Sequence, residues 1–230
     1  MAFYLDYADR TYTEVANWYN SGQRFWIGVG GDSHARRLLE QFLTSETRYL
    51  FPKLKIFDVD FGISGGLAST YMWNHWSLNM FENRRQNFDI VVLMIGSNDP
   101  DQYPGPTPWH VTREIEKIVK DLTFRNGKIV YVVQIPGRHT FRSAIKKNYI
   151  AVNRSIGHKL ERMLKNRYIH LPPGSYQESA FARETYRGRP ALVHLTSERY
   201  SDLADGIFRH IDNDLQNFAS MPSSLSMFNK

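Results

Sequence analysis

The sequence predicts an α/β fold built around a mostly parallel sheet, and three patterns support this prediction. Short apolar segments alternate along the chain with segments of helical periodicity, as they do in βαβ units. Two apolar segments, 90–95 and 129–135, are rich in β-branched residues and hydrophobic throughout, which is typical of buried parallel strands. Between the strands, apolar residues recur at helical spacing along one stripe.

The elements follow in order from these patterns. Strands are expected at 25–29, 54–59, 90–95, 129–135 and 168–171. Apolar helical stripes run from Ala35 to Leu43, Val111 to Leu122, Ile150 to Leu164 and Tyr200 to Phe218. Thr196 or Ser197 is placed to cap the last of these helices. A further short helix is expected around Tyr12–Tyr19.

Chain length and composition indicate one globular domain. The 230 residues are enough for one α/β domain, which we place at 25–218, with an extension at 1–24 packed on it and a flexible tail at 219–230. The absence of cysteine excludes a disulfide framework, a thiolate metal site and a cysteine nucleophile. We expect a soluble protein without a signal peptide, because the first residues lack a basic start followed by an apolar segment. Its compartment stays open.

The charge balance is basic, with 29 Lys and Arg against 23 Asp and Glu, a formal net charge of +6. Basic surfaces attract polyanions, so nucleic acid or an anionic membrane surface is an open partner. No nucleic-acid-binding motif supports that partner. The eight histidines show no metal-ligand spacing, and we expect neither a metal nor a cofactor.

Residues 28–38, GVGGDSHARRL, form a glycine-rich turn between the first strand and a helix, and two chemistries use such a turn. It can cradle a phosphate, or it can present a nucleophilic serine. A dinucleotide fingerprint would need a glycine where Ser33 stands, and Asp32 would put negative charge beside the phosphates. No Walker lysine follows the glycines, so the serine interpretation is favoured.

A serine hydroxyl needs a base to activate it and hydrogen-bond donors for the developing oxyanion. Three later stretches offer such groups after predicted strands or before the last helix. They are FGISGG at 61–66 with Gly65, IGSND at 95–99 with Asn98, and LVHLTSERY at 192–200 with His194. Because the carboxyl ends of parallel strands meet at one edge of the sheet, we expect these residues to converge there.

These stretches, in this order, resemble the motifs of the SGNH/GDSL hydrolase superfamily, and the resemblance extends from about residue 25 to about residue 212. It implies a three-layer α/β/α sandwich with a five-stranded, flavodoxin-like sheet. It further implies that Ser33 is the nucleophile and contributes its backbone N–H to the oxyanion hole. Gly65 and Asn98 would be the other oxyanion donors, and His194 would be the general base.

One position departs from the family pattern. The histidine usually closes an Asp-x-x-His motif, but here the residue three before His194 is Ala191. Three explanations are open: a Ser–His dyad, a carboxylate from elsewhere in the chain, and an inactive site. The acidic residues considered for the second explanation are Glu184, Glu198 and Asp202, none of which has the family spacing.

Further residues near the motifs have supporting roles in this interpretation. Asp32 is expected to bond backbone amides of its own turn, and Asp99 to hold the loop after the third strand. His34 is expected at the solvent or at the rim of a cleft. Arg138 and His139 follow the fourth strand and are candidate substrate contacts.

The function expected from these residues is that of a serine esterase or deacetylase acting on a small ester or acetylated substrate. We expect it to work through an acyl-enzyme on Ser33, as a Ser–His dyad or a weakened enzyme. Acyl transfer to a sugar would use the same chemistry. The alternative is a catalytically inactive protein of the same fold that binds a partner through its basic surface.

Overall fold

The structure is a computed structural model of the 230-residue chain. It describes residues 17–56, 61–62, 89–99, 107–125, 127–136, 143–164, 167–186 and 189–220. The fold and the site below concern these residues.

The central sheet is parallel throughout its described pairs and confirms the predicted class. Its strands are β1 (Phe25–Gly31), β2 (Leu54–Ile56), β3 (Phe61–Gly62), β4 (Ile90–Met94), β5 (Ile129–Val133) and β6 (Tyr168–Ile169). Both β2 and β3 pair with β1, β2 along its first half and β3 at its end, so together they fill one position. The order is β2-β1-β4-β5-β6, which is the flavodoxin-like order of five strand positions.

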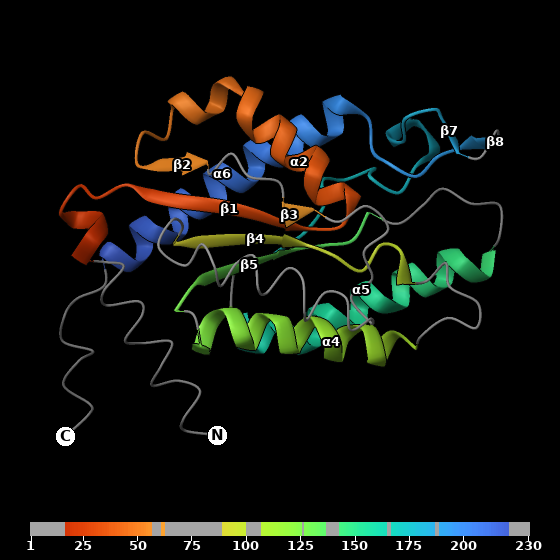
Figure 1. Cartoon of the computed structure of the whole chain (residues 1–230), viewed down its shortest axis with the longest axis horizontal. Helices are drawn as coiled ribbons and strands as arrows, with labels where there is room; N and C mark the ends of the chain where they lie inside the picture. The colour runs from red at the N-terminus through yellow and green to blue at the C-terminus, as the bar shows by residue number, and fades with distance from the viewer. Residues whose placement is uncertain are drawn as a thin grey trace.

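Two pairs of helices cover the two faces of this sheet, which makes the predicted three-layer sandwich (Figure 1). Helices α2 (Ser33–Thr44) and α6 (Ser197–Ala219) contact each other on one face. Helices α4 (Pro108–Lys120) and α5 (Ser143–Leu164) contact each other on the other face. The capping role expected of Thr196 is confirmed, because its side chain accepts a hydrogen bond from Arg199 N.

The hydrophobic core has two parts, one on each side of the sheet. Along β4, Val92 and Met94 pack in the cluster under α2 and α6, while Val91 and Leu93 pack in the cluster under α4 and α5. Side chains of a strand point alternately to its two faces, and here both faces are buried. This is why the strands read as continuous apolar segments rather than as an alternation.

Short elements complete the fold, and one pair of them was not predicted. They are 3₁₀ turns at Glu46–Tyr49 and Glu178–Ala180, a π-helical turn at Asp121–Arg125, and the strands β7 (Glu184–Tyr186) and β8 (Arg189–Ala191). Strands β7 and β8 form an antiparallel hairpin that lies beyond the carboxyl ends of the sheet strands (Figure 1). Three-residue strands of polar composition carry no periodicity that the sequence could display.

Some terminal predictions fall partly outside the described residues. Residues 17–20 are helical, while the rest of the helix expected around Tyr12–Tyr19 lies outside them, as does the tail from residue 221. Of the strand expected at 54–59, residues 54–56 are observed as β2 and 57–59 lie outside the described part, while β3 at 61–62 was not predicted. Among the described helices, none is long and apolar enough to cross a membrane.

Gly31, the last residue of β1, lies against the backbone of Met94 in β4. Its φ is +145°, and a Cβ built there would lie 1.9 Å from the carbonyl oxygen of Met94. We expect Gly31→Ala to lower the free energy of unfolding by about 3 kcal/mol or more, because both backbone strain and a backbone clash oppose the new methyl group. Urea unfolding followed by circular dichroism measures this change.

The matched control for Gly31 is Gly206 in α6. A Cβ at Gly206 would meet no atom within 4 Å, so Gly206→Ala should raise stability by up to about 1 kcal/mol through helix propensity. Equal stability of Gly31→Ala and the unmodified protein would contradict the close approach.

Candidate active site

The junction between β1 and α2 places Ser33 at the start of a helix. Asp32 is the N-cap of α2, and its Oδ1 accepts a hydrogen bond from His34 N at 2.9 Å. Ser33 is therefore the first helical residue, whose backbone N–H has no intrahelical acceptor. The N-terminal end of a helix also carries partial positive charge. An anionic oxygen next to Ser33 would meet both features.

Asp32 is completely buried and ties the end of β1 to the end of β4. Its Oδ2 accepts hydrogen bonds from Ser97 N at 3.0 Å and from Ser97 Oγ at 2.6 Å. Burial raises the pKa of Asp32 to about 6, against the opposing effect of these hydrogen bonds. At neutral pH the carboxylate is thus ionised and accepts three hydrogen bonds, as an acceptor-only group should.

The loop after β4 carries Asn98 and Asp99 and is anchored on two sides. Gly96 turns the chain with φ +106°, a conformation that side-chain-bearing residues rarely adopt. The carbonyl of Ser97 accepts a hydrogen bond from Tyr149 Oη of α5 at 2.6 Å. Asn98 and Asp99 are buried directly after this fixed residue. The segment that holds Asn98 is therefore attached to α2 through Asp32 and to α5 through Tyr149.

Ser33 and His194, separated by 161 positions in the sequence, lie side by side in the structure. The distance from His194 Nε2 to Ser33 Oγ is 2.8 Å, within hydrogen-bond range. His194 lies three residues before α6, in a segment that pairs with 180–182 through backbone bonds such as Ala182 N to His194 O. The imidazole is part-buried, so a small molecule can still reach it.

Glu184 of β7 supplies a carboxylate to His194. Its Oε2 lies 2.6 Å from His194 Nδ1, and its Oε1 lies 2.6 Å from the guanidinium of Arg37. Arg37 stands one helical turn after Ser33 on α2. The four side chains Ser33, His194, Glu184 and Arg37 therefore form a ring that starts and ends on the same helix. Arg37 is 41% exposed, so its ion pair with Glu184 contributes little to the free energy of folding. We assign it the role of holding Glu184 in position.

The register of the β7–β8 hairpin explains how Glu184 reaches this position. Glu184 pairs directly with Ala191, the position at which the family motif has its aspartate. Directly opposite residues of an antiparallel pair stand on the same face of the ribbon, about 5 Å apart. Glu184 on β7 therefore supplies a carboxylate directly across from position 191, where the family motif has its aspartate.

The geometry bears on the three explanations of Ala191. A carboxylate oxygen of Glu184 lies within hydrogen-bond distance of His194 Nδ1, which is the contact that the second explanation, a carboxylate from elsewhere, requires. A Ser–His dyad or a weakened enzyme stays a prediction. The other two candidates, Glu198 and Asp202, stand in α6, where Asp202 contacts Arg199 instead.

His34 is not at the solvent or at a cleft rim, and that expectation is wrong. The residue is completely buried, and its ring centroid lies 5.0 Å from that of His194. Its Nδ1 lies 2.5 Å from Tyr200 Oη. Burial, reinforced by the charge of Asp32, raises the pKa of Tyr200 well above its usual range, so the phenol keeps its proton to donate. The burial follows from the packing of α2 against α6, which brings Tyr200 to His34, and a contact between such distant segments is not displayed by the local sequence.

Three candidate residues of the sequence lie outside the described part of the chain. They are Gly65, Arg138 and His139. Their assignments as oxyanion donor and substrate contacts stay predictions.

Three residues that contact the site, Arg37, Ser97 and Tyr200, were not predicted from the sequence. Arg37 had one available signal, the spacing of four residues that puts it on the same side of α2 as Ser33. Ser97 and Tyr200 had none, since their partners Asp32 and His34 come from distant segments. Over the described ranges, no group of three or more His, Cys, Asp or Glu side chains is arranged to hold a metal ion.

Comparisons with known proteins agree with the fold at low sequence identity. No protein-family model matches the chain, and no curated protein matches it. Among solved structures, the carbohydrate acetylesterase Est24 from Sinorhizobium meliloti has 16% identity and a TM-score of 0.58, over 83% of this chain and 99% of that one. A G-D-S-L family lipolytic protein from Desulfitobacterium hafniense DCB-2 has 12% identity and a TM-score of 0.56, over 81% and 99%.

The chain therefore shares its fold with this esterase and with a protein of the G-D-S-L family, and the predicted fold is confirmed. Two further similar structures are also esterases by name. The acetyl xylan esterase AlAXEase has 14% identity and a TM-score of 0.57, over 81% of this chain and 99% of its own. The psychrotrophic esterase EstA from Pseudoalteromonas sp. has 12% identity and a TM-score of 0.56, over 83% and 98%.

Proposed function

We propose that this protein is a serine esterase that cleaves small esters through an acyl-enzyme on Ser33. The observation that carries the proposal is a pair of hydrogen-bond distances, from Glu184 Oε2 to His194 Nδ1 and from His194 Nε2 to Ser33 Oγ. In this arrangement Glu184 accepts from His194 Nδ1–H, which leaves Nε2 to accept the proton of the Ser33 hydroxyl. A carboxylate in this place orients the imidazole and stabilises its charged form.

The chemistry then proceeds in two halves. Ser33 Oγ attacks the ester carbonyl while its proton passes to His194 Nε2, and the carbonyl oxygen becomes an oxyanion. His194 gives that proton to the departing alcohol oxygen as the C–O bond breaks, which leaves the acyl group on Ser33. Water attacks the acyl-enzyme with His194 as base, and the acid leaves as Ser33 recovers its proton. Metal and cofactor have no part in these steps.

Oxyanion stabilisation is assigned to the Ser33 backbone N–H, the Asn98 side chain and Gly65. The Ser33 N–H stands at the start of α2, where the helix favours negative charge. Asn98 follows a residue fixed by Asp32 and Tyr149, so its segment is preorganised before substrate arrives. Preorganised donors are the largest single contribution to catalysis in many acyl-transfer enzymes.

The substrate class we propose is a small acyl ester, with acetyl esters of sugars as the first natural candidates. Support comes from two similar structures that are named as a carbohydrate acetylesterase and an acetyl xylan esterase. Acyl transfer to a sugar instead of water remains within the same mechanism. The alternative of an inactive binding protein finds no support in this geometry, because Ser33 and Glu184 each lie within hydrogen-bond reach of His194.

The proposal predicts turnover of simple activated esters. The purified chain should hydrolyse p-nitrophenyl acetate or butyrate between pH 6 and 9, and a fluorophosphonate probe should label Ser33, as located by peptide mass spectrometry. Neither turnover nor labelling in protein shown to be folded by circular dichroism would contradict the proposal.

A further inference from the structure

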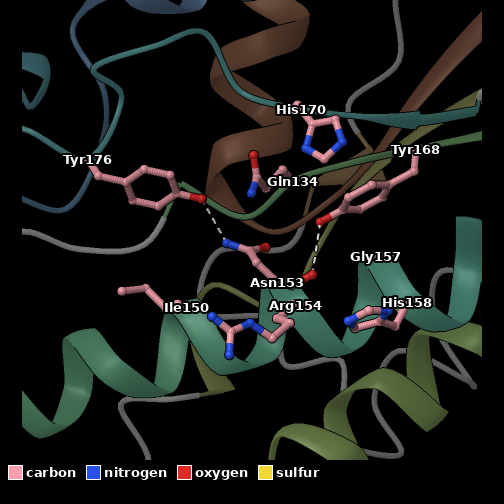
Figure 2. A pocket seen from close by; sticks show the side chains of 9 residues that line it. All are labelled: Gln134, Ile150, Asn153, Arg154, Gly157, His158, Tyr168, His170 and Tyr176. Atoms are coloured by element: carbon pink, nitrogen blue, oxygen red, sulfur yellow. Dashed lines mark hydrogen bonds between the residues drawn. The ribbon is translucent and has the colours of Figure 1, made fainter.

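A pocket of about 320 Å³ lies where the carboxyl ends of β5 and β6 meet helix α5 (Figure 2). None of the four residues of the Ser33–His194–Glu184–Arg37 ring lines it. In the sheet order, β5 and β6 stand two and three strands from β1, which corresponds to about 10–14 Å at ordinary strand spacing. The pocket therefore lies apart from the Ser33–His194–Glu184–Arg37 group.

Two tyrosines line this pocket, and hydrogen bonds to Asn153 of α5 hold them in place. Tyr176 Oη lies 2.9 Å from Asn153 Nδ2, and Tyr168 Oη donates to the Asn153 carbonyl at 3.3 Å (Figure 2). The amide of Asn153 is itself fixed by two hydrogen bonds to the backbone of Ile135. Both phenol hydroxyls are engaged with α5. Tyr176 is 38% exposed and offers ring surface to a ligand, whereas Tyr168 is only 5% exposed.

The polar groups around the opening are hydrogen-bond donors. Arg154 and His158 stand one turn apart on the exposed side of α5, and His170 comes from the end of β6 (Figure 2). Gln134 accepts from Leu171 N at 2.9 Å through its Oε1, so its NH₂ group is the donor left for a ligand. None of the described lining residues is acidic. Guanidinium and imidazole groups in this arrangement suit a phosphate.

Gly157 is a second, independent sign that this space is kept open. It lies inside the 22-residue helix α5 and lines the pocket. A Cβ built at Gly157 would meet only Tyr168 Cε1, at an ordinary 3.5 Å, so packing does not require glycine here. Glycine inside a helix is unfavourable relative to alanine. A side chain larger than that of alanine at position 157 would take up part of the pocket volume.

We propose that this pocket binds a small phosphate monoester that carries a ring, such as a nucleoside monophosphate. The ring would lie against Tyr176, and the phosphate would be held by Arg154 and His158. The cavity volume is at the lower end of ordinary ligand pockets, which fits a mononucleotide rather than a dinucleotide. The inference concerns binding alone and does not depend on the esterase activity.

Isothermal titration of the full chain with AMP tests the proposal, with adenosine, ribose 5-phosphate and inorganic phosphate as separate ligands. We expect saturable 1:1 binding of AMP, at least about tenfold weaker binding of adenosine, and weak binding of phosphate alone. Arg154→Gln should weaken AMP binding at least about tenfold. Gly157→Leu should abolish it by filling the pocket without changing any charge, while Gly157→Ala should retain most of it.

The control variants separate the pocket from general charge attraction. Arg209 is exposed on α6, on the opposite face of the sheet, and Arg209→Gln removes the same charge as Arg154→Gln. Arg209→Gln and Ser33→Ala should bind AMP like the unmodified protein, with thermal melting to verify the fold of every variant. The proposal is overturned if AMP fails to saturate, if folded Gly157→Leu still binds it, or if Arg209→Gln weakens binding as much as Arg154→Gln.

Discussion

Replacing Ser33 by alanine is expected to lower kcat for p-nitrophenyl acetate by about 10⁶, to the limit of detection. The variant keeps the helix cap of Asp32, the fixed loop at Ser97 and the pair of His194 and Glu184, but it has no oxygen to attack the ester. Initial rates over a range of substrate concentrations measure the loss, and fluorophosphonate labelling should disappear with it.

Ser21→Ala is the matched control for this prediction. Ser21 is exposed, and its hydroxyl bonds the carbonyl of Trp18 at the far end of β1, so its loss should leave kcat unchanged. If Ser33→Ala retained more than about one percent of the original kcat, another nucleophile would be responsible.

Glu184→Gln is expected to lower kcat by about 10³–10⁴ with a small change in KM. Loss of the orienting carboxylate in another serine hydrolase costs about 10⁴, and Glu184 is partly exposed to solvent, which reduces its effect. The amide of glutamine can present the wrong partner to His194 Nδ1 and no longer stabilises an imidazolium. Rates of ester hydrolysis and of fluorophosphonate labelling should fall together, because both need an activated Ser33.

Glu198→Gln provides the matched control for Glu184→Gln. Glu198 lies in the first turn of α6, close in sequence to His194, and was one of the alternative carboxylates. Its amide variant should keep full activity. Equal loss in the two variants would mean that negative charge in general, and not the contact of Glu184, supports the reaction.

The pairing of Glu184 with Ala191 across the hairpin allows a further test of the same contact. In the Glu184→Gln background, Ala191→Asp places a carboxylate at the directly opposite position of the hairpin. Because opposite residues share a face, part of the lost kcat should return. No recovery in a folded double variant would show that the hairpin does not present position 191 to His194.

The arrangement of Ser33, His194, Glu184 and Arg37 depends on the position of one helix, α2. Ser33 and Arg37 stand one turn apart on α2, and between them they fix both ends of the His194–Glu184 pair. The carboxylate therefore comes from a short hairpin whose position depends on a partly exposed ion pair. In the proposed enzyme, alanine at position 191 is tolerated because the acidic group is attached to another strand.

Much of the fold was determined by the sequence alone. The alternation of apolar segments and helical stripes predicted all five strand positions of the sheet and its four covering helices, since burial on both faces makes a strand apolar throughout. The motif residues Ser33 and His194 were also found in the sequence, because their local contexts, a glycine-rich turn and the approach to a capped helix, are short-range patterns. Features that depend on residues nearby in the sequence can therefore be predicted from the sequence.

The tertiary structure alone decided the partners of these residues. Glu184 meets His194 only because a hairpin of two three-residue strands folds back with a particular register, and such short strands carry no hydrophobic period. His34 is buried against Tyr200, 166 positions away, although it was expected at the solvent or at the rim of a cleft. The sequence therefore singled out Ser33 and His194 as candidates, whereas the carboxylate next to His194 depended on long-range strand pairing, which local patterns do not encode.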